Sequence, residues 1–251
     1  MKRNQQILGS RRSIVAAIGL LGICVSASRA EANRPAANGY STGVRTRDGI
    51  GKYYFGREIA HFMSHVGAPW LERPERDQQE RPDLVMESLD LKPGDRVADL
   101  GCGTGYFSSR LARAVGPTGV VYGVEIQPEM LKLLASSMAE QKITSVVPVL
   151  GAVDDPLLPE PVDLVLMVDV YHEMSHPAEL MAAVCRSLKP RGRVVFVEYR
   201  AEDPDVPIRP LHKMTEAQIR REMAVQPLDF TRTVETLPRQ HLVIFRKRAE
   251  R

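Results

Sequence analysis

The sequence predicts an α/β protein built on a doubly wound, mostly parallel, Rossmann-like sheet of seven strands with an antiparallel hairpin at its C-terminal end. Three observations predict this fold. Short runs rich in Val and Leu recur without polar alternation, as in strands that are buried on both faces. Helical segments separate these runs, which indicates right-handed strand-helix-strand crossovers. A loop with three glycines follows the first run, where open α/β sheets bind ligands.

The expected elements follow in chain order. The parallel strands are predicted at residues 96–100, 120–126, 146–150, 164–169 and 194–198. The helices around them are predicted at residues 83–89, 106–115, 128–142, 177–188 and 215–225. Two further apolar runs, 230–237 and 241–246, lie too close together for a helical crossover. These two runs should therefore form the C-terminal hairpin.

The segment before the sheet has a different composition and a different spacing of apolar residues. Residues 33–51 are rich in Gly, Asn, Pro and Thr and have no apolar period, so a linker is expected. In residues 52–66, apolar side chains recur at near-helical spacing, which predicts an amphipathic helix. We therefore expect a helical cap over residues 52–80, followed by the main domain over residues 81–251.

The first 32 residues resemble an export signal. Five basic side chains against Glu31 give this segment a charge of +4, so the remainder of the chain carries 3 − 4 = −1. Its uncharged stretch, Ile14 to Val25, has 12 residues, fewer than the roughly 20 needed to span a bilayer. Arg11-Arg12 resembles a twin-arginine signal. A periplasmic or exported protein is expected, without stable membrane insertion after cleavage; an uncleaved membrane tether is the alternative.

Charge and cysteine content exclude some classes of function. The chain after residue 32 is nearly neutral and has no excess of basic residues, so a nucleic-acid partner is not expected. The three cysteines, Cys24, Cys102 and Cys185, do not have the spacing of a metal site, and no metal is predicted from them.

The glycine loop carries the first chemical signal. Asp99 precedes Gly101, Gly103 and Gly105, in the order acid, G-x-G-x-G. A nicotinamide-binding loop would have G-x-G-x-x-G and a pyrophosphate at the helix N-terminus. The carboxylate of Asp99 instead favours a positively charged ligand, and Glu125 ends the next strand, where it can accept hydrogen bonds from ribose hydroxyls.

With these motifs, residues 81–247 resemble the class I S-adenosylmethionine-dependent methyltransferases. The resemblance is closest to the small-molecule branch that includes ubiquinone and menaquinone C-methyltransferases, and to uncharacterised bacterial members with an N-terminal export signal. It implies S-adenosylmethionine as cofactor and a small or medium organic acceptor with an O, N or C nucleophile. The cofactor-binding residues that it implies are Asp99, Gly101, Cys102, Gly103, Gly105, Glu125, Ile126, Asp154 and Asp169.

One part of the family pattern is missing. Members often carry Asp directly after the glycine that ends the third strand, whereas this chain has Ala152 after Gly151. By resemblance to catechol-type O-methyltransferases, Asp154 is then the expected contact of the adenine amine. A turn formed by Asp154 and Asp155 before Pro156 is the structural alternative.

The loop after the fourth strand contributes the catalytic candidates, Asp169 and His172. An imidazole titrates near neutrality and could remove a proton from the acceptor, although methyl transfer also proceeds by positioning alone. Tyr171 is expected to be a wall of the pocket, and the end of the fifth strand, Glu198 to Arg200, should face the same rim. From the N-terminal cap, the candidate lid residues are Tyr53, Tyr54, Arg57 and Trp70.

Two other functions compete with methyl transfer. A catalytically silent relative could bind a nucleoside or metabolite in the cell envelope, and an export signal favours it because the cofactor is made in the cytoplasm. A nicotinamide oxidoreductase is disfavoured by the glycine spacing. An anionic acceptor could be bound by His212, Lys213 or His241, and the oligomeric state is open.

Overall fold

The computed structural model describes residues 38–249. The predicted signal segment, residues 1–32, lies outside this range, as do the first five residues of the predicted linker. Among residues 38–249, no helix has both the length and the apolar character needed to cross a bilayer.

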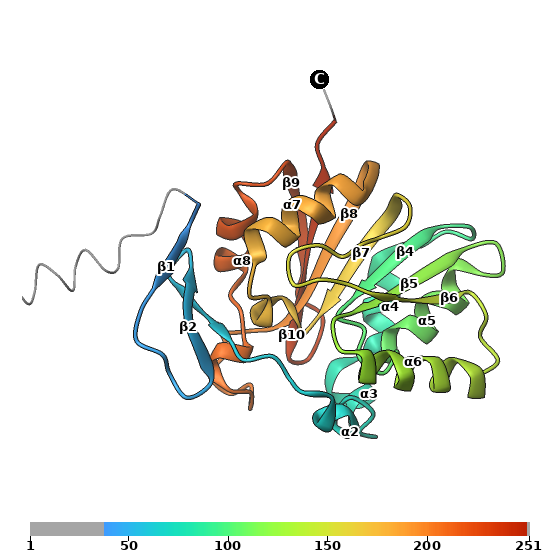
Figure 1. The fold of residues 1–251 in the computed structure, drawn as a ribbon, viewed down its shortest axis with the longest axis horizontal. Helices are drawn as coiled ribbons and strands as arrows, with labels where there is room; N and C mark the ends of the chain where they lie inside the picture. Colours follow the sequence, from blue (N-terminus) through green and yellow to red (C-terminus); the bar gives the residue numbers. More distant parts are fainter. Residues whose placement is uncertain (1–37, 250–251) are drawn as a thin grey trace, which may run out of the picture.

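A seven-stranded sheet forms the centre of the fold (Figure 1). Its order is β6-β5-β4-β7-β8-β10-β9. The first five strands in this order pair in parallel, and β10 pairs antiparallel with both β8 and β9, which confirms the predicted fold and the C-terminal hairpin. The strands are β4 (Arg96–Leu100), β5 (Val120–Glu125), β6 (Val146–Leu150), β7 (Val162–Val168), β8 (Leu188–Tyr199), β9 (Leu228–Val234) and β10 (Gln240–Lys247).

Helices cover both faces of this sheet. One face packs against α4 (Pro82–Leu89), α5 (Tyr106–Val115) and α6 (Pro128–Glu140), and the other packs against α7 (Pro177–Ser187) and α8 (Glu216–Met223). In β7, Leu164 and Leu166 face the first layer while Val165 and Met167 face the second. Burial on both faces explains why the strands carry continuous apolar runs.

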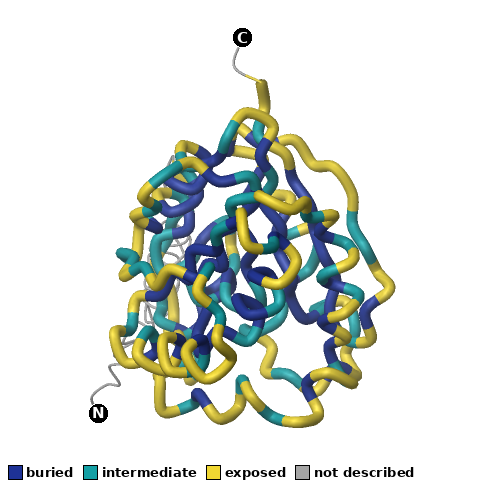
Figure 2. The backbone as a smooth tube through the Cα atoms, turned by 90° about the vertical axis from the view of Figure 1, so that its right-hand side faces the viewer, coloured by how far each residue is buried: buried dark blue, intermediate teal, exposed yellow. Residues whose placement is uncertain are grey.

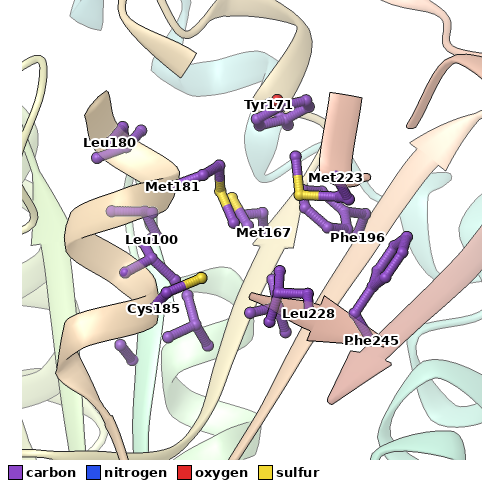
Figure 3. Close-up of a cluster of buried hydrophobic side chains, with 14 of the residues drawn as sticks. Leu100, Met167, Tyr171, Leu180, Met181, Cys185, Phe196, Met223, Leu228 and Phe245 are labelled. Carbon is purple, nitrogen blue, oxygen red and sulfur yellow. The ribbon is translucent and has the colours of Figure 1, made fainter. Parts of the chain in front are cut away.

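The second face holds a large apolar cluster between α7 and the strands. Figure 3 shows Met181 and Cys185 of α7 facing Met167 of β7, with Phe196 and Phe245 from the neighbouring strands beside them. The burial colouring in Figure 2 shows the same arrangement for the whole molecule, with buried segments at the centre and exposed loops outside. This packing holds the ends of β4 and β7 in place.

Residues 49–60 form a β-hairpin, so the predicted amphipathic helix over residues 52–66 is wrong. The strands β1 (Tyr40–Thr42), β2 (Gly49–Tyr54) and β3 (Arg57–Ala60) form a separate antiparallel sheet, which lies beside α8 in Figure 1. Between β2 and β3, Phe55 and Gly56 have φ of +47° and +88°. Two left-handed residues in succession are the geometry of a tight hairpin turn, and this turn overrides the near-helical spacing.

The rest of the N-terminal segment is made of short helices. These are η1 (His65–Gly67), α2 (Ala68–Leu71) and α3 (Arg76–Glu80). Two more single-turn helices follow later, η2 (Tyr171–Glu173) after β7 and η3 (Pro210–His212) after β8. The predicted cap is therefore helical only in its second half.

The strand order places a topological switch between β4 and β7. From β4 the chain continues outward through β5 and β6, and then returns to add β7 on the opposite side of β4. The loops that leave the carboxyl ends of β4 and β7 therefore diverge, and open α/β sheets bind ligands at such a point.

Candidate functional site

The glycine loop leaves β4 at the switch point and is fixed to the neighbouring strand. The backbone N–H groups of Gly101 and Cys102 both donate to the carbonyl oxygen of Val124, at 2.8 and 3.1 Å. The φ angles of Gly101, Gly103 and Gly105 are +76°, +54° and +92°. These left-handed conformations strain any residue with a Cβ, so the turn into α5 requires glycine.

Other parts of the chain lie close against these glycines. A Cβ on Gly101 would lie 2.5 Å from Cγ2 of Val170, in the loop after β7, and one on Gly103 would lie 2.6 Å from Cδ1 of Leu71, in α2. The glycine loop is thus enclosed by the β7 loop on one side and by the N-terminal segment on another.

Two carboxylates lie at the carboxyl ends of β4 and β5. Asp99 is 3% exposed and accepts a hydrogen bond from Oγ of Ser108 at 2.6 Å. Burial raises the pKa of Asp99 to about 6, against the hydrogen bond from Ser108. Glu125 is also buried, and its Oε1 accepts from the backbone N–H groups of Ile126 and Gln127, at 2.7 and 3.0 Å. Burial raises the pKa of Glu125 as well.

Asp169 follows β7 and adds a third carboxylate, which is partly buried. Its backbone has φ of +50°, and its Oδ2 accepts from Nε2 of Gln240 at 2.7 Å. Its Oδ1 is buried, and no group within residues 38–249 forms a hydrogen bond with it. Burial, and then the charges of Glu80 and Glu198, raise the pKa of Asp169 well above its ordinary value. An unsatisfied oxygen at the switch point is available to a ligand donor.

His172 lies in a buried cluster of polar groups next to this loop. Its Nδ1 lies 2.6 Å from Oε2 of Glu198, and its Nε2 lies 3.2 Å from Nδ1 of His212 and 3.7 Å from Oε1 of Glu173. Burial lowers the pKa of His172, but Glu198 and Glu173 outweigh that effect and raise it to about 10. The same contacts lower the pKa of Glu173 to about 2, against the effect of its burial.

The N-terminal segment contributes contacts that the sequence did not reveal. Oε1 of Glu72 accepts from the hydroxyl of Thr104 within the glycine loop. Buried Glu80 pairs with Arg73 and Arg76 and accepts from the hydroxyl of Tyr199. A charged, proline-broken stretch has no period that would place it on the sheet, so its sequence carried no signal for these contacts.

The four candidate lid residues occupy different places. Tyr54 is buried, and its ring lies 4.9 Å from that of Tyr40. Arg57 forms a buried ion pair with Glu222 of α8, while Tyr53 donates to the backbone carbonyl of Val44. Trp70 is 51% exposed and stacks with the guanidinium of Arg73. The residues that contact the glycine loop from the N-terminal side are instead Leu71 and Glu72.

Tyr171 packs in the apolar core. It is fully buried, and its ring meets that of Phe196 edge-on with the ring centroids 4.9 Å apart. Figure 3 shows both side chains within the apolar cluster. Its interior position corrects the expectation that it forms a pocket wall, because large apolar rings are stabilised by packing on all sides.

The remaining candidates lie around the site or away from it. Ile126 is 41% exposed, next to Glu125, and Cys102 is a buried free thiol whose pKa is raised by its burial. Asp154 is exposed in the loop after β6. Among the suggested anion-binding residues, Nζ of Lys213 donates to loop carbonyls, and His241 is buried in β10.

The site fits a nucleoside cofactor that carries positive charge. Two buried carboxylates, Asp99 and Glu125, and the partly buried carboxylate of Asp169 lie around a glycine loop at the switch point, and within residues 38–249 no group donates to Oδ1 of Asp169. Burying like charges together raises their pKa values, and a cationic ligand would offset that cost. S-adenosylmethionine combines such charge with ribose hydroxyls. The fold defines the class of this chain as a Rossmann-like α/β protein with a seven-stranded, mostly parallel sheet.

Residues 91–235 match the family model described as a methyltransferase domain. Because this match covers more than half of the chain, the protein belongs to that family of S-adenosylmethionine-dependent methyltransferases.

Among curated proteins, the chain is 31% identical over 119 residues to the ubiquinone/menaquinone biosynthesis C-methyltransferase of Ectopseudomonas mendocina, a match that covers 46% of each. It is 32% identical over 116 residues to an uncharacterised 37.1 kDa transposon protein of Streptomyces fradiae, over 46% of this chain and 33% of that protein. The chain thus spans between a third and a half of the length of these relatives.

Solved structures share the fold. A methyltransferase from Aquifex aeolicus matches with a TM-score of 0.69 at 23% identity, covering 74% of this chain and 99% of that one. The magnesium protoporphyrin IX methyltransferase of Synechocystis matches with a TM-score of 0.51 at 22% identity, over 68% of this chain and 79% of that one.

Proposed function

We propose that this protein transfers a methyl group from S-adenosylmethionine to a small or medium organic acceptor. The observation that supports it best is the pair of buried carboxylates, Asp99 and Glu125, at the ends of adjacent strands beside the glycine loop. When bound, S-adenosylmethionine supplies a methyl group on an activating sulfonium.

Each carboxylate has a distinct part in this proposal. Glu125 accepts hydrogen bonds from the ribose hydroxyls, because the backbone N–H groups of residues 126 and 127 hold its carboxylate in one orientation. Asp99 compensates the charge of the amino end of the cofactor. Asp169 offers its free Oδ1 to a donor on the cofactor or on the acceptor.

His172 serves better as a positioning residue than as a general base. With a pKa of about 10, its imidazole is protonated at neutral pH, and its contacts with Glu198 and Glu173 keep it so. A general base must have a free lone pair at the working pH. The ring therefore fixes the loop between β7 and η2, which borders Asp169.

The test of cofactor binding is calorimetric titration of the protein with S-adenosylmethionine. Glu125→Ala should weaken binding by about 1–2 kcal/mol, roughly 5- to 30-fold in Kd, because charge-assisted hydrogen bonds are lost. Glu129→Ala is the matched control, since Glu129 lies in the first turn of α6 on the surface. An unchanged Kd for Glu125→Ala, or no binding by the unaltered protein, would refute the proposal.

A second experiment separates an enzyme from a silent binding protein. The protein is incubated with cofactor carrying a labelled methyl group and with a cell-envelope extract. Label transferred to an organic product supports the enzyme, and at a subsaturating cofactor concentration transfer should be slower in Glu125→Ala. Tight binding without transfer would favour the binding protein, in which the carboxylates serve recognition alone.

A further inference from the structure

Three potential metal ligands converge beside the candidate site. They are Nε2 of His172, Nδ1 of His212 and Oε1 of Glu173. The two nitrogens are 3.2 Å apart, and Oε1 of Glu173 lies 3.4 Å from the His212 nitrogen and 3.7 Å from the His172 nitrogen. Two separate single-turn helices, η2 and η3, bring these atoms together.

These separations match the edges of a tetrahedral coordination shell. Zinc binds imidazole nitrogen and carboxylate oxygen at about 2.0–2.2 Å, so ligand atoms around it are separated by about 3.3–3.6 Å. We propose that His172, His212 and Glu173 bind one divalent transition-metal ion of the zinc type. This site does not depend on the methyltransferase function proposed above.

The surroundings of His172 support the proposal independently of these distances. Nδ1 of His172 donates to the carboxylate of Glu198, which is fully buried and also accepts from the backbone N–H of Tyr171. Metal-binding histidines commonly donate their second ring N–H to a carboxylate in this way, which fixes the tautomer and aims the other nitrogen at the ion. Nε2 of His172 is therefore directed at the cluster.

A hydrogen bond also fixes the orientation of the Glu173 carboxylate. Its Oε2 accepts from the backbone N–H of Met63 at 3.0 Å, so Oε1 faces the two imidazoles. The side chain of Glu173 is 12% exposed and that of His212 is 22% exposed, whereas His172 is 2% exposed. The ion would thus be reached from the His212 side, and its fourth position would be free for water or an acceptor group.

The chemistry of the ligands selects the class of metal. Two imidazoles and one carboxylate suit zinc or a similar first-row ion, while magnesium and calcium prefer oxygen alone. Two glutamates, Glu173 and Glu198, balance the double positive charge. In the metal-free protein Nε2 of His172 carries a proton, and the ion displaces this proton when it binds.

The metal site is also connected to the cofactor side of the molecule. The backbone N–H of Met63 donates to Glu173, and the backbone carbonyl of Met63 accepts from Nε2 of Gln127. The backbone N–H of Gln127 in turn donates to Glu125. One residue of the N-terminal segment, Met63, thus lies between the proposed metal site and the proposed ribose contact.

The test uses the full-length protein after removal of metals with a chelator. Titration with Co²⁺ should give one equivalent with the intense visible absorption of tetrahedral coordination, and Zn²⁺ should displace it. Zn²⁺ should also raise the melting temperature of the protein. His212→Gln and Glu173→Gln should abolish the absorption and that rise, while His65→Gln, which removes an exposed histidine of η1, should change neither.

A second set of variants separates metal binding from folding. Glu198→Gln should fold but bind Zn²⁺ about 10- to 100-fold more weakly, the usual effect of losing a carboxylate behind a ligating histidine. If this buried variant does not fold, His212→Gln decides the question alone, because its side chain lies nearest the surface. Absence of a tetrahedral Co²⁺ spectrum, or an unchanged affinity in His212→Gln, would overturn the proposal.

Discussion

At the scale of single residues, Asp99 shows how burial sets the charge of this site. Its carboxyl has one short hydrogen bond, from Ser108, and is otherwise shielded from water at the end of β4. The ionised form therefore costs free energy in the ligand-free protein, and a bound cation would recover it.

This balance predicts a pH-dependent stability. The pKa of Asp99 is about 6 in the folded chain, above its ordinary 3.8. The stabilisation from its protonated form is complete below pH 3.8 and is lost as the pH rises through 6, by up to about 3 kcal/mol. Urea unfolding of the ligand-free protein should thus show Asp99→Asn gaining stability over the natural protein between pH 4 and pH 7.

Ser108→Ala provides the complementary variant. Removing the hydrogen bond that favours the ionised form should raise the pKa of Asp99 further and extend the upper end of the pH-dependent window. Stability curves of Asp99→Asn and the natural protein that stay parallel from pH 4 to 7 would contradict this account of Asp99.

A side chain at position 101 should destabilise the folded protein. Gly101→Ala forces a Cβ into a left-handed backbone and to within 2.5 Å of the branched side chain of Val170, which cannot easily rotate away. Gly56→Ala has a similar φ, but its Cβ would lie more than 4 Å from the neighbouring atoms of the part of the chain that the structure describes. Urea denaturation should show a loss of roughly 1–2 kcal/mol for Gly56→Ala and a clearly larger one for Gly101→Ala. Equal losses would mean that the contact with Val170 adds nothing to the cost of the substitution in free energy of unfolding.

At the scale of elements, the N-terminal hairpin is joined to the main domain by one buried ion pair. Nε and Nη2 of Arg57 in β3 lie 2.8 and 3.1 Å from the two carboxylate oxygens of Glu222 in α8. Nη1 of Arg57 donates to the carbonyl of His172 at 3.0 Å. The hairpin thus holds α8 and the loop after β7 together.

Removing one partner of this pair should be much worse than removing both. Arg57→Met leaves Glu222 charged and fully buried, which costs about 3–5 kcal/mol, whereas the double variant Arg57→Met with Glu222→Met should recover most of that loss. Urea denaturation of the two single variants and the double variant measures the coupling. Strictly additive losses would show that the hairpin is held by apolar contacts instead.

At the scale of the whole molecule, the N-terminal segment contacts the sheet domain at several places, two of which lie at α8 and at the glycine loop. Its hairpin packs beside α8, and its short helices place Leu71 and Glu72 against the glycine loop. A ligand that reaches Gly103 must therefore pass or displace α2.

Cofactor binding should consequently change the dynamics of this segment. Because residues 68–80 rest on the glycine loop, a saturating concentration of S-adenosylmethionine should slow amide hydrogen exchange there, as ligand contacts make local opening less frequent. Peptides from β9, at the far edge of the sheet, serve as the reference. Exchange over residues 68–80 that is unchanged at saturation would show that the segment does not respond to the site.

The sheet domain was predictable because local pattern and burial agree there. The runs at 96–100 and 146–150 are strands with those bounds, and the helix at 106–115 also matches its prediction. The hairpin at 49–60 was missed because its apolar spacing fits a helix by chance, while the turn at Phe55-Gly56 depends on two left-handed residues, of which only one is glycine.

The sequence by itself determined the parallel sheet, the glycine turn and the acidic residues at two strand ends, since each follows from short-range spacing and the need to bury apolar runs. Only the tertiary structure decided which side chains meet. Leu71 reaches Gly103, and His212 and Glu173 join His172 because packing brings together segments that are distant along the chain. No local period encodes such contacts, since their free energy comes from burial shared between separate elements.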